Sequence, residues 1–168
     1  ASGSIGAGAA AQAAPDGYTW LLAFDTQGVN ASLMRLPFDT VKDFAPVSLT
    51  HLTPYVFVVS AQSSVQSLAE LIRHVRANPG KVSYGTTGPG SPQQLSTLLL
   101  AQQLGLPEMT EIQYKGSSAA HPDLIANRVT FMIDPLAAAA PHIKSGLLRA
   151  LAVTTPQRNA AHPAIPTA

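Results

Sequence analysis

The most regular pattern of hydrophobic and polar positions in the chain begins at Ser67. Hydrophobic residues recur from there at intervals of three and four, which places them on one face of a helix. They are Leu68, Leu71, Ile72 and Val75. Ser67 and Glu70 have the spacing of a capping box, in which two side chains satisfy backbone amides at a helix start. A helix is therefore predicted from Ser67 to the turn at Asn78–Gly80.

Short apolar runs alternate with further helical patterns along the rest of the chain. The expected strands are Tyr55–Val59, Lys81–Tyr84, Glu111–Tyr114, Val129–Ile133 and Leu148–Val153. The helices expected between them, after the one at Ser67, are Ser91 to Leu104, Ser118–Asn127 and Leu136–Ser145. Strands joined by helices pair in parallel through right-handed crossovers. The pattern predicts an α/β fold, with a parallel-type sheet and helices on both faces.

The helix that opens at Ser91 carries a second hydrophobic stripe. Ser91 is suited to cap its first turn, and Gly105 is suited to end its last turn. Three leucines fall on one face of this helix, and we expect them to point toward the core. They are Leu95, Leu98 and Leu99.

The first fifty residues show weaker signals. An alanine-rich helix is expected over Ile5 to Ala14, stopped by the turn at Pro15–Gly17. Tyr18–Phe24 is predicted as a buried strand and Val47–Leu52 as a second strand. A short helical piece is expected near Asn30.

Composition narrows the classes of function. Hydrophobic residues make up 46% of the 168 residues, whereas charged residues reach only 11%, against roughly 25% in an ordinary soluble domain. The net charge of +1 provides no basic face, so nucleic acid is not an expected partner. The absence of cysteine excludes thiol nucleophiles, thiolate metal sites and disulfides within the chain.

The loop Gly85–Ser91 is the first candidate for chemistry. It follows an expected strand and leads into a helix, which is where parallel α/β sheets bind ligands. Its glycines let the backbone approach a ligand, and Thr86 and Thr87 supply hydroxyl groups. Backbone amides at a helix start can hold an anion without a formal charge. A plain tight turn between strand and helix explains the same composition equally well.

Nucleotide-binding motifs do not fit this loop. A P-loop requires a lysine after its last glycine, and no lysine follows Gly90. The dinucleotide fingerprint requires a third glycine where this chain has Gln93. Both nucleotide interpretations are excluded.

Three charged residues at expected strand ends are further candidates. Asp134 and Asp25 could each accept hydrogen bonds either from a ligand or from neighbouring loop amides. Lys115 could meet a carboxylate at the rim of a cleft, although an isolated surface lysine is the commoner outcome.

No combination of residues indicates catalysis. The five histidines never fall at three- or four-residue spacing, so surface or half-buried positions are expected for them rather than a metal site. No serine lies in a G-x-S-x-G elbow. No nucleophile, base and orienting group assemble, so we expect no catalytic residue, no metal and no cofactor.

A set of short motifs, in order along the chain, resembles one family of proteins. The matching stretches are Ile5–Ala7, Ala14–Thr19, Leu36–Asp39, Lys42–Val47, Asn78–Lys81, Tyr84-Gly85 with Gly88 and Gly90, Tyr114–Gly116, Pro141–Gly146 and Arg149–Thr154. Together they resemble the receptors of tripartite tricarboxylate transporters, also called the Bug family of periplasmic solute-binding proteins. Each stretch is weak alone, but the set is specific.

The resemblance implies a type II periplasmic-binding-protein fold of two lobes, a Venus flytrap, with a carboxylate held between them. Residues 1–58 then form part of the first lobe, 59–153 form the second lobe, and 154–168 begin the return to the first. The family's opening strand, its Pro-Gly-Gly ligand loop and its closing segment have no match here. The first lobe is therefore expected to be incomplete, and the chain to be a central fragment of about half a family member.

The resemblance also implies a set of ligand contacts. The Gly85–Ser91 loop matches the second-lobe ligand loop, and Thr26 to Asn30 matches a first-lobe loop that faces the cleft. The expected ligand-binding residues are Gly85, Thr86, Thr87, Gly88, Gly90, Ser91, Gln94, Asp134, Asp25, Thr26 and Asn30. Gln94 stands where many members have histidine, and Asp25 where they often have a small or hydroxyl residue.

The expected function is capture of a small organic carboxylate in the periplasm for the membrane subunits of a secondary transporter, by a protein that is monomeric at full length. Two alternatives remain open. A sensory module would use the same lobes to signal to a partner. An α/β enzyme acting on a small carboxylate would need catalytic groups that the sequence does not bring together.

Overall fold

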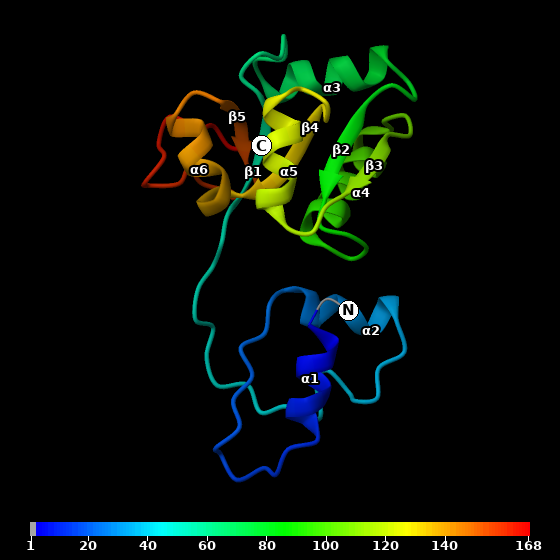
Figure 1. The fold of residues 1–168 in the computed structure, drawn as a ribbon, viewed down its shortest axis with the longest axis vertical. Helices are drawn as coiled ribbons and strands as arrows, with labels where there is room; N and C mark the ends of the chain where they lie inside the picture. Colours follow the sequence, from blue (N-terminus) through cyan, green and yellow to red (C-terminus); the bar gives the residue numbers. More distant parts are fainter. Residues whose placement is uncertain (1–2) are drawn as a thin grey trace. The chain divides into compact units, whose positions relative to one another are not determined.

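The computed structural model describes residues 3–168, which form two compact units (Figure 1). The N-terminal unit extends to Thr50 and includes Gly90–Pro92. The second unit comprises His51–Pro89 and Gln93–Ala168, and we call it the sheet unit.

The sheet unit alternates strands and helices in the predicted order. Its elements are β1 (Tyr55–Ser60), α3 (Leu68–Ala77), β2 (Ser83–Thr86), α4 (Pro92–Leu104), β3 (Thr110–Gln113), α5 (Ser117–Ile125), β4 (Phe131–Pro135), α6 (Leu136–Lys144) and β5 (Leu148–Val153). This confirms the α/β class. Every strand boundary lies within two residues of its expected position, which is the accuracy with which local patterns place the ends of elements.

The direction of one strand differs from the expectation of a parallel sheet. The strand order is β3-β2-β4-β1-β5, and β2 pairs in parallel with both β3 and β4. β1 pairs antiparallel with β4 and with β5, so β1 alone is inverted in a mixed sheet. The helical link from β1 to β2 is compatible with either direction, because the two strands are not neighbours in the sheet and form no ladder with each other.

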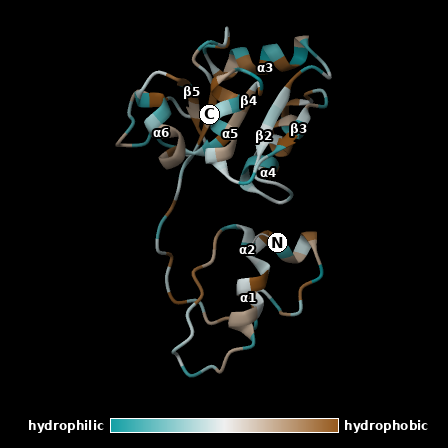
Figure 2. Cartoon of the chain, viewed as in Figure 1, coloured by the Kyte–Doolittle hydropathy of each residue, from teal (hydrophilic) through white to brown (hydrophobic). Residues whose placement is uncertain are grey.

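Helices cover both faces of the sheet, as predicted. One face packs β1, β4 and β5 residues against α5 and α6, with Leu124 and Leu136 among the helix contributions. The other face packs strand residues against α3, through Leu71 and Val75, and against Leu100 of α4. The hydrophobic colour of Figure 2 is accordingly strong along the central strands.

The start of α3 matches its sequence signal closely. Ser67 Oγ accepts a hydrogen bond from the amide of Glu70 at 3.2 Å. The Glu70 carboxylate reaches back to the amide of Gln66 at 2.7 Å, one residue before the cap. The buried residues of the helix are Leu71 and Val75, which fall on the predicted face.

The orientation of α4 corrects a sequence expectation. Leu95, Leu98 and Leu99 are 37%, 50% and 54% exposed, so they do not face the core of the described chain. The buried side chains of α4 are instead Gln93 and Thr97. A hydrogen bond from Thr87 of the preceding loop, described below, holds Gln93 on the inward face.

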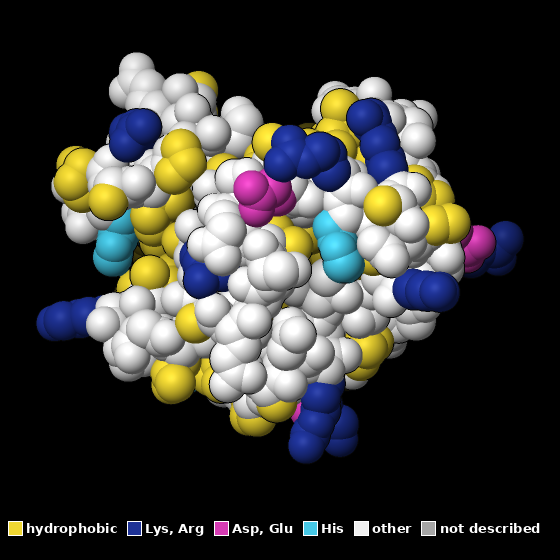
Figure 3. Space-filling view, turned by 90° about the horizontal axis from the view of Figure 1, so that it is seen from above, with side chains coloured by type: hydrophobic (Ala, Val, Ile, Leu, Met, Phe, Trp, Pro, Cys, Tyr) yellow, Lys and Arg dark blue, Asp and Glu magenta, His cyan; other side chains and the backbone are white. Residues whose placement is uncertain are grey.

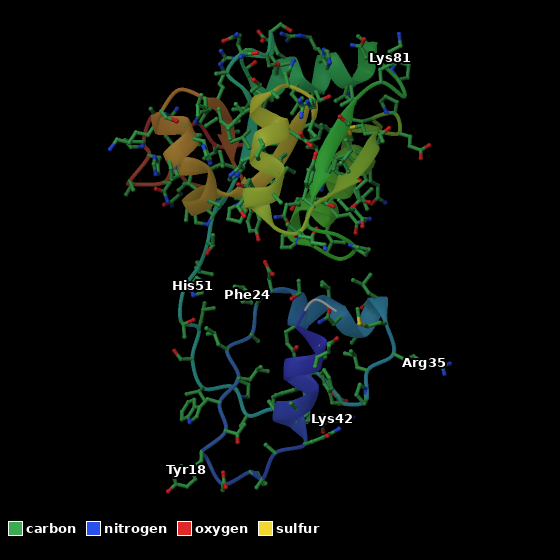
Figure 4. All side chains as sticks on the ribbon, in the orientation of Figure 1. Tyr18, Phe24, Arg35, Lys42, His51 and Lys81 are labelled. Atoms are coloured by element: carbon green, nitrogen blue, oxygen red, sulfur yellow. The ribbon has the colours of Figure 1, made fainter. Side chains whose placement is uncertain are left out.

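The described residues of the N-terminal unit contain two helices, α1 (Ser4–Ala11) and α2 (Thr26–Leu33). The predicted strands at Tyr18–Phe24 and Val47–Leu52 are wrong, because neither segment pairs with another strand among the described residues. Tyr18 and Phe24 are 89% and 69% exposed and project from the irregular chain in Figure 4. A strand requires a hydrogen-bonding neighbour as well as an apolar, β-branched or aromatic sequence.

The last residues, after β5, pack on the sheet unit. Ile165 is buried in the same core cluster as α5 and α6. The amide of Val153 donates to the carbonyl of Pro166 at 2.8 Å, and that of Ala168 donates back to Val153 at 2.9 Å. This segment therefore contributes to the core.

Candidate functional site

The carboxyl ends of three strands lie at one edge of the sheet unit. Because β2, β3 and β4 are mutually parallel, the loops that follow them begin at the same edge (Figure 1). These are Gly85–Ser91, Tyr114–Ser117 and the junction of β4 with α6 at Pro135. Three of the candidates predicted from sequence therefore lie at this edge: the Gly85–Ser91 loop, Lys115 and Asp134.

The Gly85–Ser91 loop is held by a network of side chains. Thr86 Oγ1 donates to Glu111 Oε1 at 2.6 Å and accepts from the amide of Gly88 at 3.1 Å. Gln94 Nε2, in the first turn of α4, donates to the other oxygen of Glu111 at 2.9 Å. We call these four residues the Glu111 network. They connect the start of the loop, its middle and the helix that follows it.

A second link ties the loop to α4. Thr87 Oγ1 donates to Gln93 Oε1 at 3.2 Å. Thr97 Oγ1, one turn further along, donates to the backbone carbonyl of Gln93 at 2.8 Å. The Thr87 bond holds the Gln93 side chain against the loop, whereas the Thr97 bond lies within α4.

The glycines of the loop have different physical roles. A methyl group at Gly85 would lie 3.4 Å from Met132 Sδ and 3.7 Å from the Tyr114 ring, so Gly85 allows close packing within the sheet unit. Gly88 and Gly90 have φ angles of +107° and +74°, which side chains rarely adopt. The loop shape thus depends on glycine at positions 88 and 90.

Asp134 lies at the end of β4 and is completely buried. One carboxylate oxygen accepts from Ser117 Oγ at 2.5 Å, and the other lies 2.9 Å from His121 Nε2. His121 is 5% exposed, and its ring meets that of His142 edge-on with centroids 4.5 Å apart. The expectation that every histidine is surface or half-buried is therefore wrong for His121.

The Ser117, His121 and Asp134 cluster does not have the order of a hydrolytic triad. In such a triad the histidine stands between the nucleophile and the carboxylate, so that it can take the nucleophile's proton. Here the carboxylate stands between the other two and bonds to each. The cluster joins α5 to β4 through a buried polar group.

The loop after β3 is anchored by a tyrosine. Tyr114 Oη donates to Asp123 Oδ2 at 3.0 Å, and Arg128 Nη1 donates to the other oxygen of Asp123 at 3.0 Å. The Arg128 hydrogen bond, aided by that from Tyr114, lowers the pKa of the Asp123 carboxyl. Burial is the main cause of the raised pKa of Tyr114. Lys115, next in sequence, is exposed.

The remaining predicted residues lie in the N-terminal unit. Asp25 precedes α2, and its Oδ1 accepts from the amide of Thr26 at 2.9 Å. Asp25 itself is exposed, whereas Asn30, in the middle of α2, is buried. Asp25 therefore stabilises a helix start whatever else it contacts.

Other surface features of the described chain add no residue to the predicted ligand-binding set. A pocket of about 430 Å³ on the N-terminal unit is lined by α1, Gln12 and residues 34–37, none of them predicted site residues. Figure 3 shows Lys and Arg side chains scattered among uncharged ones on the face it draws. Among residues 3–168 no three His, Asp or Glu side chains converge as metal ligands. No helix in this range is long and apolar enough to cross a membrane.

Three residues that matter to this edge escaped sequence reasoning: Glu111, Ser117 and His121. From sequence, Glu111 is predicted only as the first residue of a strand. Ser117 and His121 are four residues apart, the spacing that places two side chains on one helical face. That spacing was a usable signal, whereas nothing local connects Glu111 to a loop more than twenty residues earlier.

The fold of the sheet unit is that of known periplasmic binding proteins. An R. palustris protein solved with adipate matches with a TM-score of 0.88 and 34% identity, covering 98% of this chain and 56% of that one. The periplasmic binding protein BugD matches with a TM-score of 0.85 and 31% identity, covering 99% and 56%. MatC from Rhodopseudomonas palustris with bound malate matches with a TM-score of 0.82 and 27% identity, covering 99% and 57%.

Sequence comparison identifies the family within this class. Residues 1–168 match the tripartite tricarboxylate transporter family receptor, and the chain belongs to that family. BugT of Bordetella pertussis is 38% identical over 170 residues, which cover 99% of this chain and 52% of BugT. The chain spans about half the length of the curated relatives it matches.

Proposed function

We propose that this chain is part of a periplasmic receptor that captures a small organic carboxylate for a tripartite tricarboxylate-type secondary transporter. The observation that carries the proposal is the family match over residues 1–168. Two relatives of similar fold were solved with dicarboxylates, adipate in one and malate in the other. The ligand class follows from these relatives, and the membrane partner from the family.

The proposed ligand contacts are divided between the two lobes of the family's architecture. The N-terminal unit contributes to the first lobe, the sheet unit from β1 to β5 forms the second, and 154–168 begin the return. In the second lobe the ligand meets the Gly85–Ser91 loop, where backbone and hydroxyl groups gather at the start of α4. In the first lobe it meets Asp25, Thr26 and Asn30. No step of this function requires a metal or a cofactor.

Chemical arguments support binding without catalysis. The buried carboxylate of Asp134 already has two partners, Ser117 and His121, and both belong to the protein. Thr86 and Thr87 of the Gly85–Ser91 loop are likewise engaged with Glu111 and Gln93. Groups committed to such internal bonds preorganise a binding surface, whereas catalysis needs a nucleophile in contact with a base.

Calorimetry on the whole protein tests the proposal. Adipate and malate are the probes, and an amino acid and a sugar of similar size are the controls. We expect at least one dicarboxylate to bind with one site per chain and to raise the melting temperature, because a ligand that binds only the folded state stabilises it. The probes should be recovered unchanged after prolonged incubation. No binding by any carboxylate, or conversion of one, contradicts the proposal.

Replacing Asp25 with serine tests the first-lobe contact. A serine hydroxyl can still cap α2, so the stability of the helix should change little. Removal of the carboxylate charge lowers repulsion of an anionic ligand, and we expect adipate and malate to bind several times more tightly. Calorimetry with parent and variant measures the ratio. Unchanged affinity for both dicarboxylates means that Asp25 acts only as the cap.

A further inference from the structure

We propose that Glu111 is a positioning residue for ligand recognition: it fixes the shape of the Gly85–Ser91 loop and the orientation of the Gln94 amide. The inference rests on the proposed function, because it concerns the same loop. It adds a residue on a different strand that contacts no ligand itself.

The sheet places Glu111 beside the loop. β3 is an edge strand, and its Glu111 is the direct partner of Tyr84 in the parallel ladder with β2. Thr86 lies two residues after Tyr84, so its side chain points to the same face of the sheet. Tyr84 belongs to the core cluster formed with α3 and α4. The Glu111 side chain therefore emerges on the face where α4 begins.

Both oxygens of Glu111 are used, and each holds a different part of the site. Oε1 accepts from the hydroxyl of Thr86 at 2.6 Å, and Oε2 accepts from Nε2 of Gln94 at 2.9 Å. Hydrogen bonds to a carboxylate are about twice as strong as those between neutral groups. One charged side chain thus joins the end of β2 to the first turn of α4.

The network assigns separate roles to Thr86 and Gln94. Thr86 is completely buried, donates its only hydroxyl proton to Glu111 and accepts from the amide of Gly88. It is a relay between Glu111 and the loop backbone rather than a ligand contact. For Gln94, the bond to Glu111 decides which end of the side-chain amide is the nitrogen. That choice determines whether the opposite end of the amide accepts or donates hydrogen bonds.

Replacing Glu111 with glutamine is the test, because it keeps size and removes one acceptor. The new amide can accept from Thr86 but would direct its NH2 group at the NH2 group of Gln94, so one amide must rotate. We expect adipate and malate affinity to fall about tenfold, which corresponds to losing one hydrogen bond to a charged group. We also expect the Gly88 amide proton to exchange faster with solvent, because its acceptor Thr86 is held less firmly.

Two further variants make the test selective. The exchange of both residues, Glu111→Gln with Gln94→Glu, restores a carboxylate–amide hydrogen bond and should recover slow exchange at Gly88. Glu108→Gln removes a nearby exposed carboxylate outside the network, so it should change neither the affinity for dicarboxylates nor the exchange of the Gly88 amide proton. If Glu111→Gln does not fold, Thr86→Val tests the relay instead. This variant should speed exchange of the Gly88 amide proton and leave the hydrogen bond between Glu111 and Gln94 intact.

The outcomes separate this inference from the proposed function. Failure of the parent protein to bind any carboxylate refutes the proposed function, yet Gly88 exchange still reports whether Glu111 orders the loop. If the parent binds and Glu111→Gln has parental affinity and parental Gly88 exchange, the inference is overturned. Lower affinity with unchanged exchange overturns the role of Glu111 in loop shape and leaves orientation of the Gln94 amide as its only action.

Discussion

Replacing Gly88 with valine should lower carboxylate affinity by roughly tenfold to a hundredfold, because backbone strain of about 1–3 kcal/mol falls on the candidate ligand loop. Gly88 has a φ angle of +107°, which a β-branched residue adopts only under strain. A methyl group there would meet no atom within 4 Å, so steric collision is not the cause. The loop must shift, and the Gly88 amide then leaves Thr86.

A matched variant separates loop shape from general strain. Gly146 also has a positive φ angle, +72°, and also has open space around it, but it lies in the turn between α6 and β5. Gly146→Val should lower the melting temperature similarly and leave affinity unchanged. Titration calorimetry and thermal unfolding of both variants provide the comparison. Equal affinity in parent and Gly88→Val would exclude the loop as the site of ligand contact.

The largest loss of stability is expected for Asp134→Ala. The substitution leaves Ser117 and His121 facing a buried cavity without their shared acceptor. Leaving buried polar groups unpartnered in this way should lower the free energy of unfolding by about 2–5 kcal/mol. Asp134→Asn keeps the shape and one acceptor oxygen, so its loss should be smaller. Urea unfolding followed by circular dichroism measures both.

An exposed carboxylate is the control for Asp134. Asp123 also has two hydrogen-bonding partners, Tyr114 and Arg128, but 35% of its side chain is exposed. Water can replace either partner, so Asp123→Ala should destabilise the protein much less. Similar losses for the two substitutions would mean that burial of Asp134 does not dominate its contribution.

Two segments with similar strand-like patterns have different conformations in the structure. Tyr55–Val59 and Tyr18–Phe24 look equally strand-like, yet only the first becomes part of a sheet. β1 has β4 and β5 on its two sides, whereas the earlier segment has no pairing partner among the described residues. An apolar run indicates a tendency to form a strand, and the partner decides whether the strand exists.

In the candidate site, too, local signals can be read from the sequence but long-range contacts cannot. The Gly85–Ser91 loop could be located from sequence because glycines, a strand before it and a helix after it are all local signals. The role of each residue in the loop could not be predicted from sequence. Thr86, for example, resembles a hydroxyl that faces a ligand, but in the structure it donates to Glu111. Asp134 likewise resembles a cleft carboxylate until its partners in α5 are placed.

The sequence alone determined the alternation of five strands and four helices from Tyr55 to Val153, because caps, glycine stops and apolar periodicity act over a few residues. Only the tertiary structure decided that β1 is inverted and that Asp134 is buried with His121. It also decided that Glu111 reaches Thr86 across 25 positions of the chain. Such pairings depend on which elements become neighbours, and that choice is made by the packing of the whole core.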